Sequence, residues 1–233
     1  MNREGAKNAK IEECGTKTLR SLRLRGETLV AAGCRAMNTE TVFRIITALL
    51  FITALFIGGS FRRKAEREGG ALRTPAGNKW VVLLRLMALV VVLPLFGYWI
   101  NPSWVAWARV ALPDWPRWIA TGVAVALLPM MVWVFTSIGK NISTSHDTRH
   151  GHVLVTHGPY RWVRHPLYSV GFLFAVALTV IAALWWLAVG MILPLFALLL
   201  RTGKEEEKLV EAFGDEYRDY MKRTGRFLPR LSQ

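Results

Sequence analysis

Two short segments near the C-terminal end of the chain place ionisable and aromatic residues on both sides of an apolar stretch. Residues 157–168 read HGPYRWVRHPLY, and residues 201–207 read RTGKEEE. If the stretch between them crosses a membrane and returns, both segments lie at the same membrane surface. Such an arrangement would let a bilayer protein build a pocket for a charged cofactor.

The first segment carries the signals of a turn followed by the start of a helix. Gly158-Pro159-Tyr160 is typical of a turn, and Pro166 is favoured at the first position of a helix. His165 then lies at or next to the N-cap. Exposed amides at this helix start, together with Arg161, Arg164 and His165, would attract a carboxylate or a phosphate. The alternative is a lipid-headgroup anchor made of arginine, tryptophan and tyrosine.

The second segment pairs a basic with an acidic residue at helical spacing. If the last apolar helix continues beyond the membrane, Arg201 and Glu205 are four residues apart and share a face. Such a pair can orient a carboxylate substrate. The alternative is a snorkelling arginine beside a solvated acidic run, although three consecutive glutamates would repel anionic lipid. A short amphipathic helix is predicted next, with one face formed by Leu209, Phe213, Tyr217, Tyr220 and Met221.

Metal and nucleic-acid sites are not favoured by the pattern. All five histidines fall between His146 and His165, but the two cysteines, Cys14 and Cys34, are far away in the sequence, so we predict no metal site.

The net charge of +14 comes from residues that lie between apolar runs rather than in one soluble block. Basic residues near membrane helices more often set topology than bind nucleic acid.

Composition predicts an all-α integral membrane helix bundle. Of the 233 residues, 52% are apolar, and several apolar runs approach the roughly 20 residues that span a bilayer. We expect about five transmembrane helices, the last two forming a tight hairpin that turns near Ala182–Trp186, and a cytosolic C-terminal amphipathic helix. The expected spans are 41–61, 80–100, 117–138, 167–183 and 185–200.

The distribution of basic residues predicts the orientation and a division of the chain. The positive-inside rule puts 62–79, 139–166 and the C-terminus in the cytoplasm, most simply at the cytoplasmic membrane. Residues 1–36 would then be outside despite eight Lys and Arg. We therefore expect 1–36 to be a disordered or misassigned leader, with translation starting at Met37 rather than Met1. Residues 37–138 form an N-terminal three-helix membrane region, and 139–233 a catalytic region.

Taken together, the motifs of residues 139–230 resemble the isoprenylcysteine carboxyl methyltransferase family, which is related to the phospholipid methyltransferases. The residues that carry the resemblance are Gly158-Pro159-Tyr160, Arg164-His165-Pro166 with Tyr168, Glu205-Glu206 with Leu209, Phe213-Gly214, Tyr217, Tyr220 and Pro229. The resemblance implies an integral membrane enzyme that uses S-adenosyl-L-methionine and binds it on the cytosolic side. It also implies that Arg201 and Glu205 are needed for catalysis.

Candidate roles follow from the chemistry of that cofactor. Its carboxylate needs a cation or amides, for which Arg164, His165 and the helix start are candidates, and its ammonium and ribose need acceptors such as Glu206 and Tyr168. Arg201 would pair with a substrate carboxylate, held by Glu205. An amine or phenol acceptor would instead need Glu205 or His157 as a base. The full set of expected cofactor-binding residues is His157, Gly158, Tyr160, Arg164, His165, Tyr168 and Glu206.

The methyl acceptor is not specified by these residues. A lipophilic acceptor reached from the bilayer is expected, with an isoprenylcysteine-type carboxylate ranked first and a phospholipid or another small molecule as alternatives. Two other classes stay open, an NADPH-dependent membrane reductase and a non-enzymatic membrane lipid-binding protein. A soluble Rossmann-type methyltransferase is excluded, because the chain lacks alternating strands and a glycine-rich strand-to-helix turn. The oligomeric state is left open.

Overall fold

The computed structural model describes residues 39–65, 67, 79–138 and 154–230. The predicted leader 1–36 and the choice between Met1 and Met37 lie outside these ranges. Met1–Phe43 and Arg44–Gln233 separate into two compact units, and the contacts described below belong to the second. Over the described ranges the chain is helical, and the β-type pairings there are two isolated bridges, Arg109 with Leu184 and Val163 with Gly225. The predicted all-α class is confirmed.

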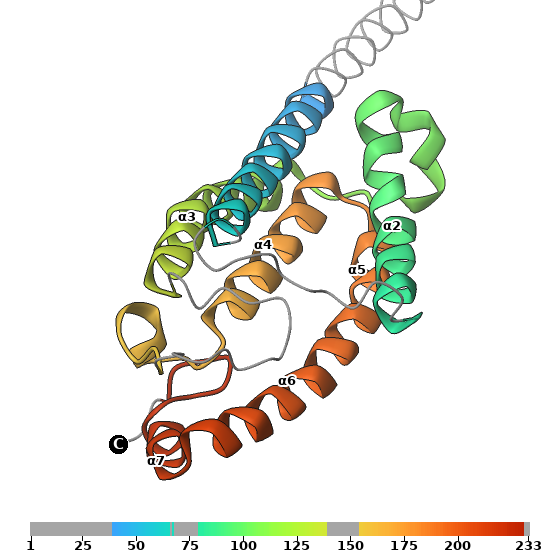
Figure 1. The fold of residues 1–233 in the computed structure, drawn as a ribbon. Coiled ribbons are helices and arrows are strands. Elements are labelled where there is room, and N and C mark those ends of the chain that lie inside the picture. Colours follow the sequence, from blue (N-terminus) through green and yellow to red (C-terminus); the bar gives the residue numbers. More distant parts are fainter. Residues whose placement is uncertain (1–38, 66, 68–78, 139–153, 231–233) are drawn as a thin grey trace, which may run out of the picture. The chain divides into compact units, whose positions relative to one another are not determined.

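Most consecutive helices are joined by short connections, and the longer intervals are residues 66–78 and 139–157. A first helix covers Thr39–Ala65. The later elements are α2 (Lys79–Ile100), η1 (Pro102–Ala108), α3 (Asp114–Ile138), η3 (Gly158–Arg161), α4 (Pro166–Ala182), α5 (Trp185–Gly190), α6 (Ile192–Phe213) and α7 (Asp215–Arg223) (Figure 1).

Several helices are long and apolar enough to cross a membrane. Thr39–Ala65, Asp114–Ile138 and the combined stretch Trp185–Phe213 meet this criterion, and Leu89–Ile100 and Pro166–Ala182 are shorter apolar helices. Many large apolar side chains of these helices are exposed, among them Leu55, Phe56, Ile119, Phe196 and Leu200. Such surfaces are stable in lipid and not in water. The chain is thus a multi-pass integral membrane protein, while the count of five spans and the tight hairpin stay predictions.

Helix α4 begins where the sequence predicts and packs along α3. Pro166 is at the first helical position and His165 is the N-cap residue. The two helices lie side by side (Figure 1), and each carries buried residues at helical spacing. Alanines such as Ala124 and Ala177 let the backbones approach closely. This packing holds the start of α4 near the end of α3, where η3 also packs.

The opposite end of α4 is closed by polar contacts and tryptophans. Ala183 has φ 52° and ψ 45°, a left-handed conformation that ends the helix. Arg117 Nε donates to the carbonyl of Ile181 at 2.8 Å, and Val110 N donates to the carbonyl of Ala183 at 2.8 Å. Helix α5 then begins at Trp185. The interruption between α4 and α5 thus falls within the range predicted for a turn.

Helix α6 carries Arg201 and Glu205, as predicted, but the amphipathic segment after it is divided. The predicted face from Leu209 to Met221 is interrupted at Gly214, where φ is 58° and ψ is −128°. Residues that carry a Cβ rarely adopt this backbone conformation. A separate helix, α7, therefore follows α6, and it buries Tyr217 and Tyr220.

Candidate active site

The segment after α7 lies against the segment that leads into α4. Arg164 N donates to the carbonyl of Gly225 at 2.9 Å, and His165 N donates to the carbonyl of Arg226 at 3.1 Å. Gly225 N returns a hydrogen bond of 3.1 Å to the carbonyl of Trp162. One helical turn into α4, Ser169 Oγ donates to the carbonyl of Phe227 at 2.6 Å. Residues 224–227, here called the C-terminal strap, thus connect α7 to the start of α4.

Helix α7 is joined to η3 by a buried tyrosine. Tyr220 Oη donates to the carbonyl of Tyr160 at 2.6 Å. Burial raises the pKa of Tyr220 to about 12, so its hydroxyl keeps the proton it donates throughout the physiological range. Thr224 Oγ1 in turn donates to the carbonyl of Tyr220 at 2.6 Å. These contacts fix the turn formed by Gly158–Arg161 against the cytosolic helix predicted from the sequence.

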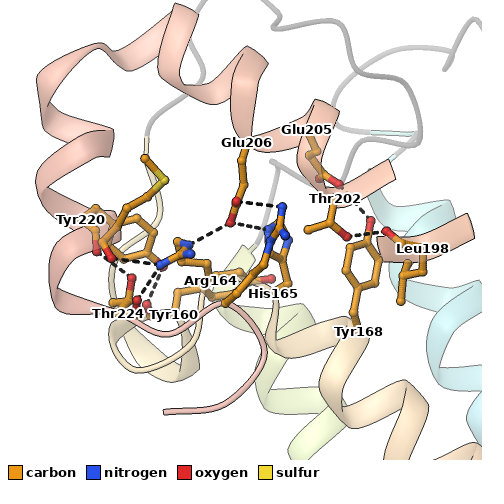
Figure 2. Close-up of polar contacts among 12 residues, drawn as sticks. Tyr160, Arg164, His165, Tyr168, Leu198, Thr202, Glu205, Glu206, Tyr220 and Thr224 are labelled. Atoms are coloured by element: carbon orange, nitrogen blue, oxygen red, sulfur yellow. Dashed lines mark hydrogen bonds and ion pairs between the residues drawn. The ribbon is translucent and has the colours of Figure 1, made fainter. Parts of the chain in front are cut away.

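Arg164 is surrounded by acceptors. Its Nε donates to Oε1 of Glu206 at 2.9 Å, and its Nη1 donates to the carbonyls of Met221 at 3.1 Å and Thr224 at 2.5 Å (Figure 2). The side chains of Arg164 and Glu206 are only 12% and 14% exposed. Charged hydrogen bonds that are shielded from water are stronger than those at the surface. Arg164 therefore joins α4, α6 and α7 at one point.

Glu206 is contacted by three basic side chains. Besides Arg164, Arg226 Nη2 lies 3.0 Å from Oε2, and His165 Nε2 lies 3.4 Å from Oε1 (Figure 2). The His165 contact is not aligned as a hydrogen bond, and its Nε2 is buried without another partner among the described residues. Burial lowers the pKa of His165, and Glu205 and Glu206 only partly oppose this effect. The imidazole is thus neutral at pH 7 and leaves the two arginines to balance the two carboxylates.

Glu205, next to Glu206, is bound from α4. Tyr168 Oη donates to Oε2 of Glu205 at 3.1 Å, and the Tyr168 ring stacks on His165 with centroids 5.5 Å apart and planes 12° apart (Figure 2). Arg201 lies one turn earlier on α6 and is exposed. Within the described ranges Arg201 forms no ion pair, so the partner of Glu205 is Tyr168 rather than Arg201.

The structure brings most of the expected site residues together. Arg164, His165, Tyr168, Glu205 and Glu206 form one cluster, here called the Glu206 cluster, and Tyr160 joins it through the Tyr220 contact. His157 and Gly158 lie instead at the N-terminal end of η3. Gly158 has φ 59°, and a Cβ there would overlap Ser137 Oγ at the end of α3.

Sequence reasoning missed the strap. Arg226 and Thr224 contribute directly to the cluster, and Met221 contributes its carbonyl. The basic residue in the sequence Arg226-Phe227-Leu228-Pro229, just before the closing proline, was the signal that could have pointed to it.

Metal-ligating residues do not gather in the part of the chain that the structure describes. No group of three or more His, Cys, Asp or Glu side chains is placed to hold an ion there. His146, His150 and His152 lie outside the described residues.

Comparison with known families identifies the segment that contains this cluster. Residues 118–211 match the isoprenylcysteine carboxyl methyltransferase (ICMT) family. The resemblance predicted from the sequence is confirmed. The ICMT match includes both chemistry-bearing segments and the α3–α4 pair, and it ends within α6, before α7 and the strap.

Curated relatives are similar over shorter stretches. The chain is 40% identical over 72 residues to a methanethiol S-methyltransferase of Pseudomonas deceptionensis, covering 31% of this chain and 27% of that protein. It is 38% identical over 79 residues to the mouse protein-S-isoprenylcysteine O-methyltransferase, covering 34% and 28%. A nickel-cobalt-cadmium resistance protein, NccN, of Alcaligenes xylosoxydans xylosoxydans is 31% identical over 119 residues, covering 50% and 56%. The chain thus spans little more than a quarter of the two methyltransferases.

A solved structure extends the likeness in fold. The eukaryotic intramembrane Ras methyltransferase ICMT superposes with a TM-score of 0.53 over 77% of this chain and 68% of that chain. The two sequences are 19% identical, so the comparison concerns the fold.

Proposed function

We propose that the chain is a membrane methyltransferase that transfers the methyl group of S-adenosyl-L-methionine to a lipophilic acceptor. The observation that carries this proposal is the Glu206 cluster, in which the two segments that resemble ICMT sequences meet in a largely buried ion-pair network. Arg164, His165 and Glu206 of this network lie inside the family match, and Arg226 follows it. The activity most like that of the relatives is carboxyl O-methylation of an isoprenylcysteine-type substrate.

The donor set of the cluster fits this cofactor in kind. S-adenosyl-L-methionine carries an ammonium and a sulfonium, which need anionic neighbours, and a carboxylate, which needs a cationic one. Glu205 and Glu206 supply the anionic neighbours, and the two arginines that contact Glu206 supply the cationic ones. The buried Nε2 of His165 and Nε of Arg226 lack hydrogen-bond partners among the described residues, which leaves capacity for a further ligand.

The cofactor, when bound, supplies an electrophilic methyl group that leaves a sulfonium in an in-line displacement. The chain's own residues must hold donor and acceptor in line and exclude water. Glu205, fixed by Tyr168, is suited to lie beside the reacting groups, and the exposed guanidinium of Arg201 is free to pair with an acceptor carboxylate. A carboxylate acceptor needs no general base.

The acceptor is proposed by analogy with two relatives whose names differ. One is a methanethiol S-methyltransferase and the other a protein-S-isoprenylcysteine O-methyltransferase. The long exposed apolar helices favour an acceptor that partitions into the bilayer. A prenylated cysteine carboxylate is therefore ranked first, and a phospholipid amine or a small thiol second.

Location follows from the same features. The Glu206 cluster lies at the end of α4 opposite the tryptophan-rich turn after Ala183. Residues 154–166, which belong to a basic loop predicted to be cytoplasmic, lead directly into the cluster. We therefore propose an active site that faces the cytoplasm from the cytoplasmic membrane.

Transfer of a radiolabelled methyl group by the detergent-purified protein tests the activity. The acceptors are a farnesylated cysteine with a free carboxylate, its methyl ester, phosphatidylethanolamine and a small thiol. We expect label in the farnesylated cysteine and none in its ester, and loss of transfer in Arg201→Ala and Glu205→Ala. Label found only in phosphatidylethanolamine or only in the thiol would identify that compound class as the acceptor instead of the prenylated cysteine. No transfer to any acceptor, with NADPH bound instead, would favour the membrane reductase, and a folded protein without either ligand would favour a lipid-binding protein.

A further inference from the structure

Arg226 is the basic residue of the Glu206 cluster with donors to spare. We propose that Arg226 binds the carboxylate at the amino-acid end of the methyl donor, and that Arg164, which the sequence favours for this role, acts as a structural connector. This inference rests on the proposed function, and it assigns one residue of the strap, outside the family match, to one group of the cofactor.

Arg164 has little capacity for a ligand. Its Nε is bound to Glu206, and its Nη1 is bound to two backbone carbonyls, those of Met221 and Thr224. Its side chain is 12% exposed. A ligand carboxylate at Arg164 would have to displace contacts that hold α7 to α4. The geometry therefore assigns Arg164 to the framework.

Arg226 has the opposite properties. Within the part of the chain that the structure describes, only its Nη2 is engaged by a polar side chain, at 3.0 Å from Oε2 of Glu206, and the side chain of Arg226 is 36% exposed. Its Nε is buried and has no acceptor among the described residues. A buried donor of a charged group that has no acceptor destabilises the protein. A carboxylate that bound this guanidinium would remove that destabilisation.

The surroundings of Arg226 fix its position. Its guanidinium carbon lies 5.9 Å from the centroid of the Phe227 ring, and its carbonyl accepts from His165 N. Gly203 of α6 is close, because a Cβ at that position would lie 3.7 Å from Arg226 Nη2. The absence of a side chain at Gly203 leaves the guanidinium room to approach α6 and Glu206.

The Arg226–Glu206 pair also matches the charge pattern of an amino acid. An α-amino acid carries its ammonium and its carboxylate on one carbon, so the two charges are adjacent. Arg226 and Glu206 present a positive and a negative charge 3.0 Å apart, so the arginine can pair with the carboxylate of the amino acid and the glutamate with its ammonium. Binding the zwitterion here pairs both of its charges without adding net charge to a partly buried site.

Binding of two methyl donors tests the assignment. S-adenosyl-L-methionine and decarboxylated S-adenosylmethionine differ only in the carboxylate. Their affinities are measured by equilibrium dialysis with the detergent-purified full chain, for the wild type and for Arg226→Gln, Arg164→Gln and Arg223→Ala. Arg223 is the matched control, because it is an exposed cation of α7 whose Nε donates a 3.4 Å hydrogen bond to the carbonyl of Asp219, away from the Glu206 cluster.

The wild type should bind S-adenosyl-L-methionine about 10- to 100-fold more tightly than the decarboxylated donor, as expected for a lost charge-assisted hydrogen bond. Arg226→Gln should weaken the affinity for S-adenosyl-L-methionine by a similar factor and leave the affinity for the decarboxylated donor within about threefold of the wild-type value. Arg223→Ala should change neither affinity, and Arg164→Gln should weaken both.

Three results would overturn the assignment. They are equal affinities of the wild type for both donors, an equal loss of both affinities in Arg226→Gln, or unchanged binding in that variant. The wild-type comparison stands even if a variant fails to fold. If the folded wild type binds neither donor, the proposed function fails together with the assignment, which distinguishes that case from the other three.

Discussion

Nε of Arg164 donates a 2.9 Å hydrogen bond to Oε1 of Glu206, a residue 42 positions later in the chain. This pair joins the basic segment before α4 to the acidic segment of α6. Both side chains are largely buried, and Arg164 also holds two carbonyls at the end of α7. The contact therefore has two consequences, one for stability and one for the ligand site that we propose around Glu206.

Replacing Arg164 should destabilise the packing of α6 and α7 against the start of α4. Arg164→Ala leaves Glu206 with one fewer partner and frees the carbonyls of Met221 and Thr224. Breaking a buried ion pair by removing one partner costs about 3–5 kcal/mol. Thermal unfolding in detergent, followed by tryptophan fluorescence, should shift to lower temperature. Arg201→Ala is the control and should leave the transition unchanged, since Arg201 is exposed. Equal transitions for wild type and Arg164→Ala would show that the pair has no structural role.

The contact between α7 and η3 depends on one hydroxyl. Tyr220→Phe removes the 2.6 Å hydrogen bond to the carbonyl of Tyr160 and leaves that carbonyl unsatisfied, at a cost of about 1–3 kcal/mol. Limited proteolysis should then cleave near α7 faster than in the wild type. Tyr217→Phe is the matched control, because Tyr217 is also buried on α7 but its hydroxyl has no hydrogen bond to another described residue. The prediction fails if both variants are cleaved at the wild-type rate.

The helices and the two motif segments could be predicted from the sequence because each has a local signal. Pro166 marks the start of α4, and the spacing of Arg201 and Glu205 fits the helix that contains them. Local signals do not say which partner a side chain takes. From the sequence, Arg164 is expected to bind the carboxylate of the cofactor and Glu206 its ammonium or ribose, yet in the structure the two side chains contact each other.

The strap and the break at Gly214 were not predicted, for physical reasons. Most strap contacts use backbone groups, such as the carbonyls of Gly225 and Phe227, and a backbone carbonyl is the same at every residue. The break at Gly214 depends on a positive φ that glycine permits but does not require. The amphipathic pattern continues across it, so the pattern alone indicates one helix rather than two.

Tyr168 should matter for turnover through Glu205. Tyr168→Phe removes the 3.1 Å hydrogen bond to Oε2 of Glu205 and keeps the stacking on His165. A hydrogen bond to a charged group contributes about 1.5–3 kcal/mol, so kcat should fall by roughly 10- to 100-fold if the orientation of Glu205 is needed. Initial-rate measurements with the preferred acceptor, at saturating methyl donor, give this value. An unchanged kcat would mean that Glu205 acts without help from Tyr168.

Stability should decrease in mild acid because of His165. Burial lowers the pKa of His165 in the folded protein, so the unfolded chain takes up a proton at higher pH than the folded one. The stability contributed by the neutral imidazole is present above the ordinary histidine pKa of about 6.5 and declines as the pH falls below it. The melting temperature of the wild type, measured from pH 8 to pH 5, should therefore fall more steeply than that of His165→Gln. Parallel curves would assign the acid sensitivity to other groups.

We propose that the Glu206 cluster binds S-adenosyl-L-methionine, and equilibrium binding to the detergent-purified protein tests this most directly. Wild type, His165→Ala, Glu206→Gln and the control Arg223→Ala are compared, each shown to be folded by its thermal transition. The account predicts saturable binding by the wild type and the control, and binding weakened at least about tenfold in both cluster variants. Wild-type affinity in a folded Glu206→Gln protein, or no binding by the folded wild type, would contradict the account.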